Sequence, residues 1–131
     1  AGPAGPEGLW VELRPPAGAI ARLYPVGARV AVNGTEDRAS AQQREVVYQV
    51  VREALTNVRR HSGSSICRVK MGFAARPFLV EVADEGQGFR LTRPGGYGLV
   101  GMRERSAGIG GRLEVVSTEG RGTTVFLFGP N

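Results

Sequence analysis

Three polar residues recur at four-residue intervals in the middle of the chain: Glu53, Asn57 and His61. In a helix, this spacing places the three side chains on one ridge. Such a ridge is ordinarily a solvated face. A carboxylate and an amide oxygen one turn apart can also serve Mg²⁺, which keeps part of its water shell and takes further ligands from phosphates. The spacing alone leaves both interpretations open.

Two glycine-containing segments follow. Asp84 precedes Glu85-Gly86-Gln87-Gly88, so a fixed carboxylate would lie beside backbone that a ligand can approach closely. Gly95-Gly96-Tyr97-Gly98 leads into a helical pattern, and the N–H groups and positive dipole end of a helix start favour phosphate. A tight turn with an Asp cap explains the first segment equally well. The sequence lacks the P-loop motif. It also lacks the other common phosphate-binding unit, a strand followed by G-x-G-x-x-G and a helix.

Hydrophobic periodicity predicts two helices that would position these residues. The first runs from Ser40 to about His61, where Ser40 and Gln43 form a capping-box signature. Its apolar stripe at helical spacing comprises Val47, Val50, Ala54 and Val58. The second helix covers residues 99–108. We expect both helices to pack on the same sheet.

Alternating apolar residues predict the strands of that sheet. They occupy residues 9–14, 29–32, 64–73, 78–84, and a hairpin formed by 112–117 and 123–128. In the fourth strand Asp84 is the last residue and points to the buried side. The expected fold is therefore α+β, a two-layer sandwich in which a mixed, mostly antiparallel sheet packs on helices.

The composition limits the remaining choices. A chain of 131 residues with 41% hydrophobic content suits one domain. We assign residues 1–8 to a linker and 9–131 to the domain. A single cysteine, Cys67, excludes an internal disulfide and fits a reducing cytoplasm, and no stretch is apolar and long enough to span a membrane. The net charge of +5 favours an anionic partner, but the basic residues are dispersed, which disfavours a nucleic-acid groove.

Four motifs, in this order, resemble one known family. REALTNVRRH resembles the N box, DEGQGF the first glycine box, GYGLVGMRER the second, and TEGRGTTVFL the last glycine and threonine segment. These are motifs of the catalytic ATP-binding (HATPase) domain of two-component sensor histidine kinases, in the GHKL superfamily with the Bergerat ATP-binding fold. GLVGMRER followed by GIGGRLEVVS resembles the subfamily that pairs with LuxR-type response regulators.

The resemblance implies binding of ATP and Mg²⁺ and a role for each matching residue. Asp84 would accept a hydrogen bond from the adenine 6-amino group, supported through water by Thr123. Asn57 would bind the metal, and Glu53, the catalytic residue, would orient its water shell. The other implied nucleotide-binding residues are Arg60, His61, Gly86, Gly88, Phe89, Gly96, Gly98, Leu99 and Val100. Residues 89–97 would form a short lid.

The same resemblance implies a protein histidine kinase whose phosphoacceptor histidine lies on a separate dimerisation domain. His61 is the only histidine and lies inside the N box, so we do not expect this domain to phosphorylate itself. Its partners would be that phosphoacceptor domain and, indirectly, a response regulator. We expect a monomeric domain from a homodimeric cytoplasmic parent that could be anchored in a membrane. The alternatives are an anti-sigma-factor-type serine kinase and a non-catalytic nucleotide-binding module of the same fold.

Overall fold

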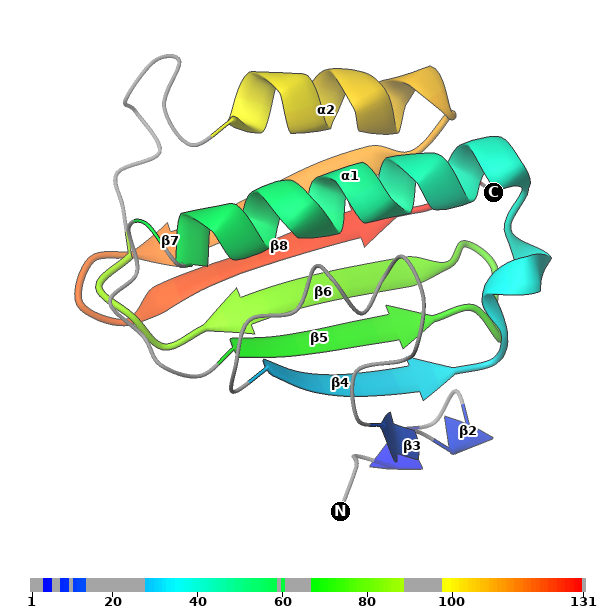
Figure 1. The fold of residues 1–131 in the computed structure, drawn as a ribbon, viewed down its shortest axis with the longest axis horizontal. Coiled ribbons are helices and arrows are strands. Elements are labelled where there is room, and N and C mark those ends of the chain that lie inside the picture. The colour runs from blue at the N-terminus through cyan, green and yellow to red at the C-terminus, as the bar shows by residue number, and fades with distance from the viewer. Residues whose placement is uncertain are drawn as a thin grey trace.

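The computed structural model describes residues 28–58, 60, 67–88 and 98–130, together with the backbone of 4–5, 8–9 and 11–13. Its strands are β1 (Ala4–Gly5), β2 (Gly8–Leu9), β3 (Val11–Leu13), β4 (Ala28–Asn33), β5 (Cys67–Gly72), β6 (Leu79–Asp84), β7 (Arg112–Thr118) and β8 (Gly122–Phe128). Its helices are α1 (Ala41–Asn57), α2 (Leu99–Gly108) and a short 3-10 helix at Glu36–Arg38. Figure 1 shows the arrangement.

The main sheet has six strands in the order β3-β4-β5-β6-β8-β7. Every neighbouring pair is antiparallel except β4 and β5, which are parallel. That one parallel pair requires a crossover connection, and α1 supplies it. Both helices lie on one face of the sheet (Figure 1). The predicted α+β sandwich with a mixed, mostly antiparallel sheet is confirmed.

The core lies between α1 and the sheet, and α2 closes one side of it. The apolar stripe predicted for the first helix is buried, and Val46, Val51 and Leu55 widen it. From the sheet, alternate residues of β5 and β6 point into the same core. The least accessible apolar side chains are Val30, Val47, Val50, Val51, Val69, Val80, Met102 and Leu127. Burial of these groups is the main stabilising contribution to the fold.

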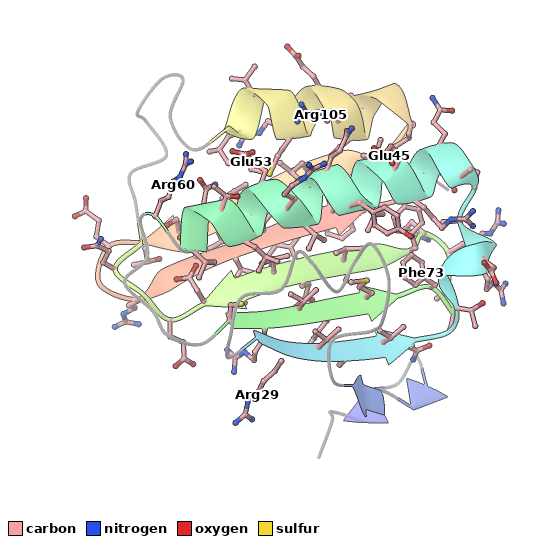
Figure 2. The ribbon with its side chains drawn as sticks, in the orientation of Figure 1. Arg29, Glu45, Glu53, Arg60, Phe73 and Arg105 are labelled. Carbon is pink, nitrogen blue, oxygen red and sulfur yellow. The ribbon has the colours of Figure 1, made fainter. Side chains whose placement is uncertain are left out.

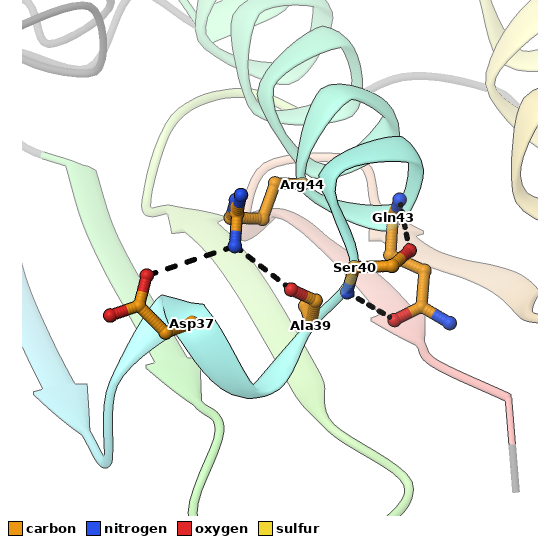
Figure 3. Close-up of polar contacts among 5 residues, drawn as sticks. All are labelled: Asp37, Ala39, Ser40, Gln43 and Arg44. Carbon is orange, nitrogen blue, oxygen red and sulfur yellow. Dashed lines mark hydrogen bonds and ion pairs between the residues drawn. The ribbon is translucent and has the colours of Figure 1, made fainter.

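The start of α1 matches its sequence signature. The Ser40 hydroxyl accepts the backbone N–H of Gln43, and the Gln43 side chain accepts the backbone N–H of Ser40. Arg44 then donates to the carbonyl of Ala39 at 3.0 Å and lies 3.7 Å from Asp37 (Figure 3). The predicted capping box is therefore confirmed.

The end of α1 comes earlier than predicted. The α-helix stops at Asn57, and the N–H of Val58 bonds the carbonyls of Ala54 and Leu55. Val58 and Arg60 have the wider, π-helical conformation. His61, to which the sequence pattern extended the helix, lies outside the described residues.

The strand predicted for residues 9–14 is divided in two. Gly8–Leu9 pairs with Ala4–Gly5 in a separate two-stranded ladder, and Val11–Leu13 joins the edge of the main sheet through β4. Residues 4–5 thus take part in backbone pairing, although residues 1–8 were predicted to be a linker. Within the described part of the chain, no helix is long and apolar enough to cross a membrane.

Candidate nucleotide-binding site

A row of polar side chains crosses one end of the sheet. Asp84 ends β6 and pairs directly with Cys67 of β5 on one side and with Thr123 of β8 on the other. Thr123 in turn pairs with Ser117 of β7. Directly opposed residues in antiparallel strands point to the same face, and this face is the one that the helices cover. The row therefore lies at the edge of the core, as predicted for Asp84.

The carboxylate of Asp84 is held by its own loop. The backbone N–H of Gly86 donates to Oδ1 of Asp84 at 2.8 Å. This local bond fixes the orientation of a half-buried carboxylate at the strand end. A negatively charged acceptor in a fixed orientation is suited to an N–H donor of a ligand. The outer neighbour Glu85 is exposed and faces Arg68 instead, at 3.4 Å.

Thr123 and Ser117 form the most enclosed polar pair of the row. Thr123 is 7% exposed, and its Oγ1 lies 2.7 Å from Oγ of Ser117. The resemblance implied a role for Thr123, and the structure brings it next to Asp84. Sequence analysis missed Ser117. The available signal was the tight turn between the two strands, because a hairpin closing there pairs Ser117 with Thr123.

Three glycines in two turns pack closely at this end of the sheet. A Cβ atom on Gly88, whose φ is +69°, would lie 2.8 Å from the carbonyl carbon of Thr118. A Cβ atom on Gly122, whose φ is +110°, would lie 2.9 Å from the carbonyl carbon of Asp84. The N–H of Gly120 also bonds the carbonyl of Gln87 at 2.7 Å. Gly88 is thus required by the packing of the loop on the β7–β8 turn, in addition to its implied role in admitting a nucleotide.

The N-terminus of α2 meets the side chain of Glu53. Gly98 begins this helix in the left-handed conformation, with φ +66° and no side-chain cap. A Cβ atom on Gly98 would lie 2.8 Å from the carboxyl carbon of Glu53. In Figure 2, Glu53 lies on the side of α1 that faces α2. The structure therefore brings together two residues that the motifs placed far apart in the sequence.

Two further predicted residues lie at the C-terminal end of α1. Asn57 is 9% exposed, whereas the sequence pattern predicted a ridge beside the apolar stripe. The structure thus encloses a side chain that the pattern placed at the edge of that stripe. Arg60 is exposed and projects from the end of the helix (Figure 2). Both residues lie at the same end of the sheet as Asp84.

The first residues of α2 have different surroundings. Leu99 is buried in the core, whereas 58% of Val100 is exposed. Only their backbone N–H groups were predicted to contact a ligand, and these belong to the first turn, where no helical carbonyl precedes them. The predicted site residues His61, Phe89 and Gly96, and the whole predicted lid at 89–97, lie outside the described residues.

Cys67 completes the row on the β5 side. The thiol is buried, and burial raises its pKa, with a further increase from the nearby Asp84 carboxylate. A raised pKa keeps the thiol protonated and poorly nucleophilic. Cys67 is therefore a small, neutral neighbour of Asp84.

A groove of about 420 Å³ lies at the opposite end of the molecule. It is lined by Ser40 and Gln43 at the start of α1 and by Phe73 and Phe78 in the β5–β6 connection. Phe78 directly precedes β6 and Asp84 ends it, so the two residues lie at opposite ends of this strand. The groove therefore belongs to a different region from the polar row.

Comparison with known proteins places the chain in a family. The family model described as histidine kinase-, DNA gyrase B-, and HSP90-like ATPases matches residues 42–130. The chain is 41% identical over 81 residues to the sensor histidine kinase LiaS of Bacillus subtilis, covering 60% of this chain and 22% of that protein. It is 32% identical over 107 residues to the oxygen sensor histidine kinase NreB of Staphylococcus carnosus, covering 79% and 31%.

Among solved structures, the histidine kinase domain of the Erythrobacter litoralis EL346 blue-light activated histidine kinase has the same fold. The TM-score is 0.64 at 23% identity, covering 79% of this chain and 51% of that one. The chain spans about a fifth to a third of the length of the curated relatives named above. The family match includes α1, both glycine boxes and the β7–β8 hairpin. The chain therefore belongs to the histidine kinase-, DNA gyrase B-, and HSP90-like ATPases and is an ATP-binding domain.

Proposed function

We propose that the chain is the catalytic domain of a sensor histidine kinase, which binds Mg-ATP and donates the γ-phosphoryl group to a histidine on a separate dimerisation domain. The observation that carries the proposal is the orientation of Asp84 by the N–H of Gly86, beside Thr123 in the polar row. The relatives named as sensor histidine kinases support the kinase assignment over the anti-sigma-factor-type serine kinase and over a non-catalytic nucleotide-binding module.

Asp84 is the residue that selects the base. Its carboxylate accepts the 6-amino group of adenine, with Thr123 supporting that contact through a water. Guanine has a carbonyl at this position, so two acceptors would face each other and GTP would be rejected. Gly86 and Gly88 let the backbone lie close to the base, with Phe89 beside it. The site therefore prefers ATP.

The phosphates extend from the base toward α2. The N–H groups of Leu99 and Val100 lie in the first turn of α2, where the helix dipole favours a negative charge. Gly98 provides no side-chain cap that would compete for these groups. On the other side, Arg60 projects from the end of α1 with an exposed guanidinium. His61 and Gly96 complete the phosphate-binding residues of this proposal.

The residues at the phosphate end fit a magnesium ion that is held mainly by the nucleotide. Asn57 offers an amide oxygen and Glu53 a carboxylate one helical turn away. Among the described residues, no three histidine, cysteine or carboxylate side chains gather into a metal site of their own. Mg²⁺ commonly takes one or two protein ligands and completes its shell with water and phosphate. Bound there, it would neutralise charge on the transferred phosphoryl group.

The transfer itself requires a nucleophilic imidazole in line with the γ-phosphoryl group. His61 comes four residues after the proposed metal ligand in the sequence, so it would lie alongside the phosphates and not opposite the leaving group. The acceptor therefore belongs to the dimerisation domain of a homodimeric parent, located in the cytoplasm where ATP is available. The phosphoryl group would then pass to a response regulator of the LuxR type.

The test has a binding part and a transfer part. Calorimetry should give magnesium-dependent ATP binding in the micromolar to millimolar range, roughly −8 to −4 kcal/mol. Asn57→Asp should weaken the magnesium-dependent part, and thermal melts with and without ligand would show whether the fold is retained. Because Asn57 is buried, a variant that no longer melts cooperatively would indicate a structural role instead.

For transfer, γ-labelled ATP is added to the chain alone and to the chain with the phosphoacceptor domain of its parent. We expect acid-labile label only on the added domain. Label on the chain alone that disappears in His61→Gln would contradict the account of His61. ATP binding without label on the added domain would favour the non-catalytic binding module.

A further inference from the structure

The loop after β6 and the turn between β7 and β8 lie against each other at three points. Gly120 and Gly88 make two of these contacts, and both involve the end of the loop. The third contact is made by Gly122, the first residue of β8, which lies against the backbone of Asp84. Of the three, it is the contact of Gly122 that involves the residue that we assign to the adenine amino group.

Gly122 has no room for a side chain. The residue is buried, its φ is +110°, and an added Cβ atom would overlap the carbonyl oxygen of Asp84. The same Cβ atom would lie 2.9 Å from the carbonyl carbon of Asp84 and 2.9 Å from Cα of Glu85. All three are backbone atoms, which cannot rotate away as the end of a flexible side chain can. A methyl group at this position would therefore displace the chain where β6 ends.

The backbone that would move determines how the Asp84 carboxylate is oriented. The carbonyl group of Asp84 and Cα of Glu85 lie along the chain just before Gly86, whose N–H donates to Oδ1 of Asp84 at 2.8 Å. A hydrogen bond weakens as its length and angle depart from the preferred values. A shift of this short segment would move the donor relative to the carboxylate. The absence of a side chain at Gly122 thus helps to set where the carboxylate lies.

The expected shift is large enough to matter for binding. Carbon atoms pack at about 3.5–4.0 Å, so a methyl group 2.9 Å from the carbonyl carbon of Asp84 requires a displacement of about 0.5 Å or more. Recognition requires the groups of a site to be held within about 0.5 Å of their productive positions. A side chain at Gly122 would therefore misplace the carboxylate relative to a bound base.

We propose that Gly122 is a positioning residue for base selection, because the space that it leaves lets the Asp84 carboxylate lie where it accepts the adenine 6-amino group. The inference rests on the proposed function. It extends the selection of adenine to a residue that acts through Asp84 and that none of the predicted site residues includes. A substitution at Gly122 should consequently weaken the contact with the amino group more than the other contacts of the nucleotide.

Purine riboside triphosphate separates that contact from the rest of the site. It has a C–H group where ATP has the 6-amino group, so it retains the purine ring, the ribose and the three phosphates but offers Asp84 no donor. The ratio of the two affinities therefore reports the Asp84 contact. The ratio does not depend on the fraction of chain that is folded, because both nucleotides bind the native state and their apparent affinities fall by the same factor.

Two other glycines provide matched controls. Gly34, at the opposite end of the sheet, has a φ of +77°, and its added Cβ atom would lie 2.9 Å from the carbonyl carbon of Phe73. Gly34→Ala thus crowds a neighbouring backbone to the same degree, away from Asp84. Gly120 belongs to the β7–β8 turn and has a φ of +80°, but no atom lies within 4 Å of its added Cβ. Gly120→Ala thus alters the backbone conformation of that turn without the crowding.

Calorimetry with Mg²⁺ measures both affinities for the unaltered chain and the three alanine variants. We expect the preference for ATP to fall about tenfold in Gly122→Ala, as for the loss of a hydrogen bond to a charged group, and to remain in Gly34→Ala and Gly120→Ala. Urea unfolding should show a loss of stability in all three, because alanine disfavours a positive φ. Trimethylamine N-oxide raises the folded fraction of a weakened variant, which keeps the ratio measurable.

A double variant tests whether Gly122 acts through Asp84. In Asp84→Asn the charged acceptor is already absent, so adding Gly122→Ala should leave the ratio nearly unchanged. The same tenfold fall in this background would show that Gly122 acts by another route and would overturn the inference.

An unchanged ratio in Gly122→Ala would also refute the inference, whether both nucleotides bind as before, are weakened equally or are lost together, because a merely structural role affects both alike. An equal fall of the ratio in either control would have the same meaning. These outcomes leave the proposed function intact. An unaltered chain that binds neither nucleotide would instead refute the proposed function, and one that binds both equally would refute the role of Asp84 within it.

Discussion

The two helices of this domain begin in opposite ways. At α1 the Ser40 and Gln43 side chains satisfy backbone N–H groups, and Arg44 bonds the carbonyl of Ala39 just before the helix. At α2 the first position is Gly98, with φ +66° and no side-chain cap. The group that approaches Gly98 is Glu53, which belongs to the other helix. One helix start is closed by its own sequence, and the other depends on distant residues.

This difference separates stability from binding. A side-chain cap stabilises its helix because it satisfies N–H groups that would otherwise lack a partner. The same cap also removes those groups from any ligand. A helix that begins with glycine keeps them accessible to an anion. We therefore expect substitutions at the start of α1 to affect mainly the free energy of unfolding, and substitutions around α2 and the polar row to affect ATP binding.

The largest expected effect is that of Asp84→Asn. The asparagine oxygen can still accept the N–H of Gly86, so the loop should be retained, but the charged acceptor for the adenine amino group is lost. We expect ATP affinity to fall about 10- to 100-fold, the range for a hydrogen bond to a charged group. Calorimetry measures it, with Glu85→Gln as the control in the exposed neighbour. Similar ATP affinities in the two variants would contradict the role of Asp84.

Gly98→Ala should have the next largest effect, because it alters both the backbone and a tertiary contact. A left-handed residue with a Cβ atom costs about 1–2 kcal/mol, and the new methyl group would also displace the Glu53 carboxylate. Urea unfolding and ATP titration should both show a loss. Gly108→Ala is the matched control in the same helix, because no atom lies within 4 Å of its added Cβ. If the two alanine variants were equally stable, the Glu53 contact would be unimportant.

Ser40→Ala should affect stability alone. Loss of an N-cap costs about 1 kcal/mol, which corresponds to a fall in Tm of roughly 3–6 °C for a domain of this size. The Kd for ATP should remain unchanged, since Ser40 lies at the opposite end of α1 from Asn57. Differential scanning calorimetry and titration give the two values. Gln42→Ala, which changes an exposed residue of the first turn, should leave the Tm and the Kd for ATP nearly unchanged. A clear loss of ATP affinity in Ser40→Ala would contradict the expectation that this helix start affects stability alone.

The smallest effect concerns Cys67 and pH. Burial, with a further contribution from Asp84, raises the pKa of this thiol. A pKa that is higher in the folded chain stabilises the fold fully below the pKa of the unfolded thiol, about 8.5, and this contribution is lost as pH rises through the folded-state pKa. The free energy of unfolding should fall less steeply above that pH in Cys67→Ala than in the unaltered chain. Parallel curves would show that the thiol does not contribute.

Much of the fold could be predicted from the sequence because its signals are local. The capping box joins residues three positions apart, and the apolar stripe of α1 follows from the helical period. The alternation in β5 and β6 likewise identified their buried faces and placed Asp84 at a strand end. The N-terminal strand was predicted less well, since its two parts pair with different partners. The π-helical turn that ends α1 early gave no sequence signal.

In the candidate site, too, some features could be predicted from local sequence and others could not. By itself, the sequence determined which residue types were available, the order of the motifs and the position of each residue along its own helix or strand. Only the tertiary structure decided that Ser117 lies beside Thr123, that Glu53 faces Gly98 and that Asn57 is enclosed. The first contact depends on strand register, and the second on the packing of α2 against α1. Each joins groups whose proximity no local period encodes, because it arises only when separate elements pack together.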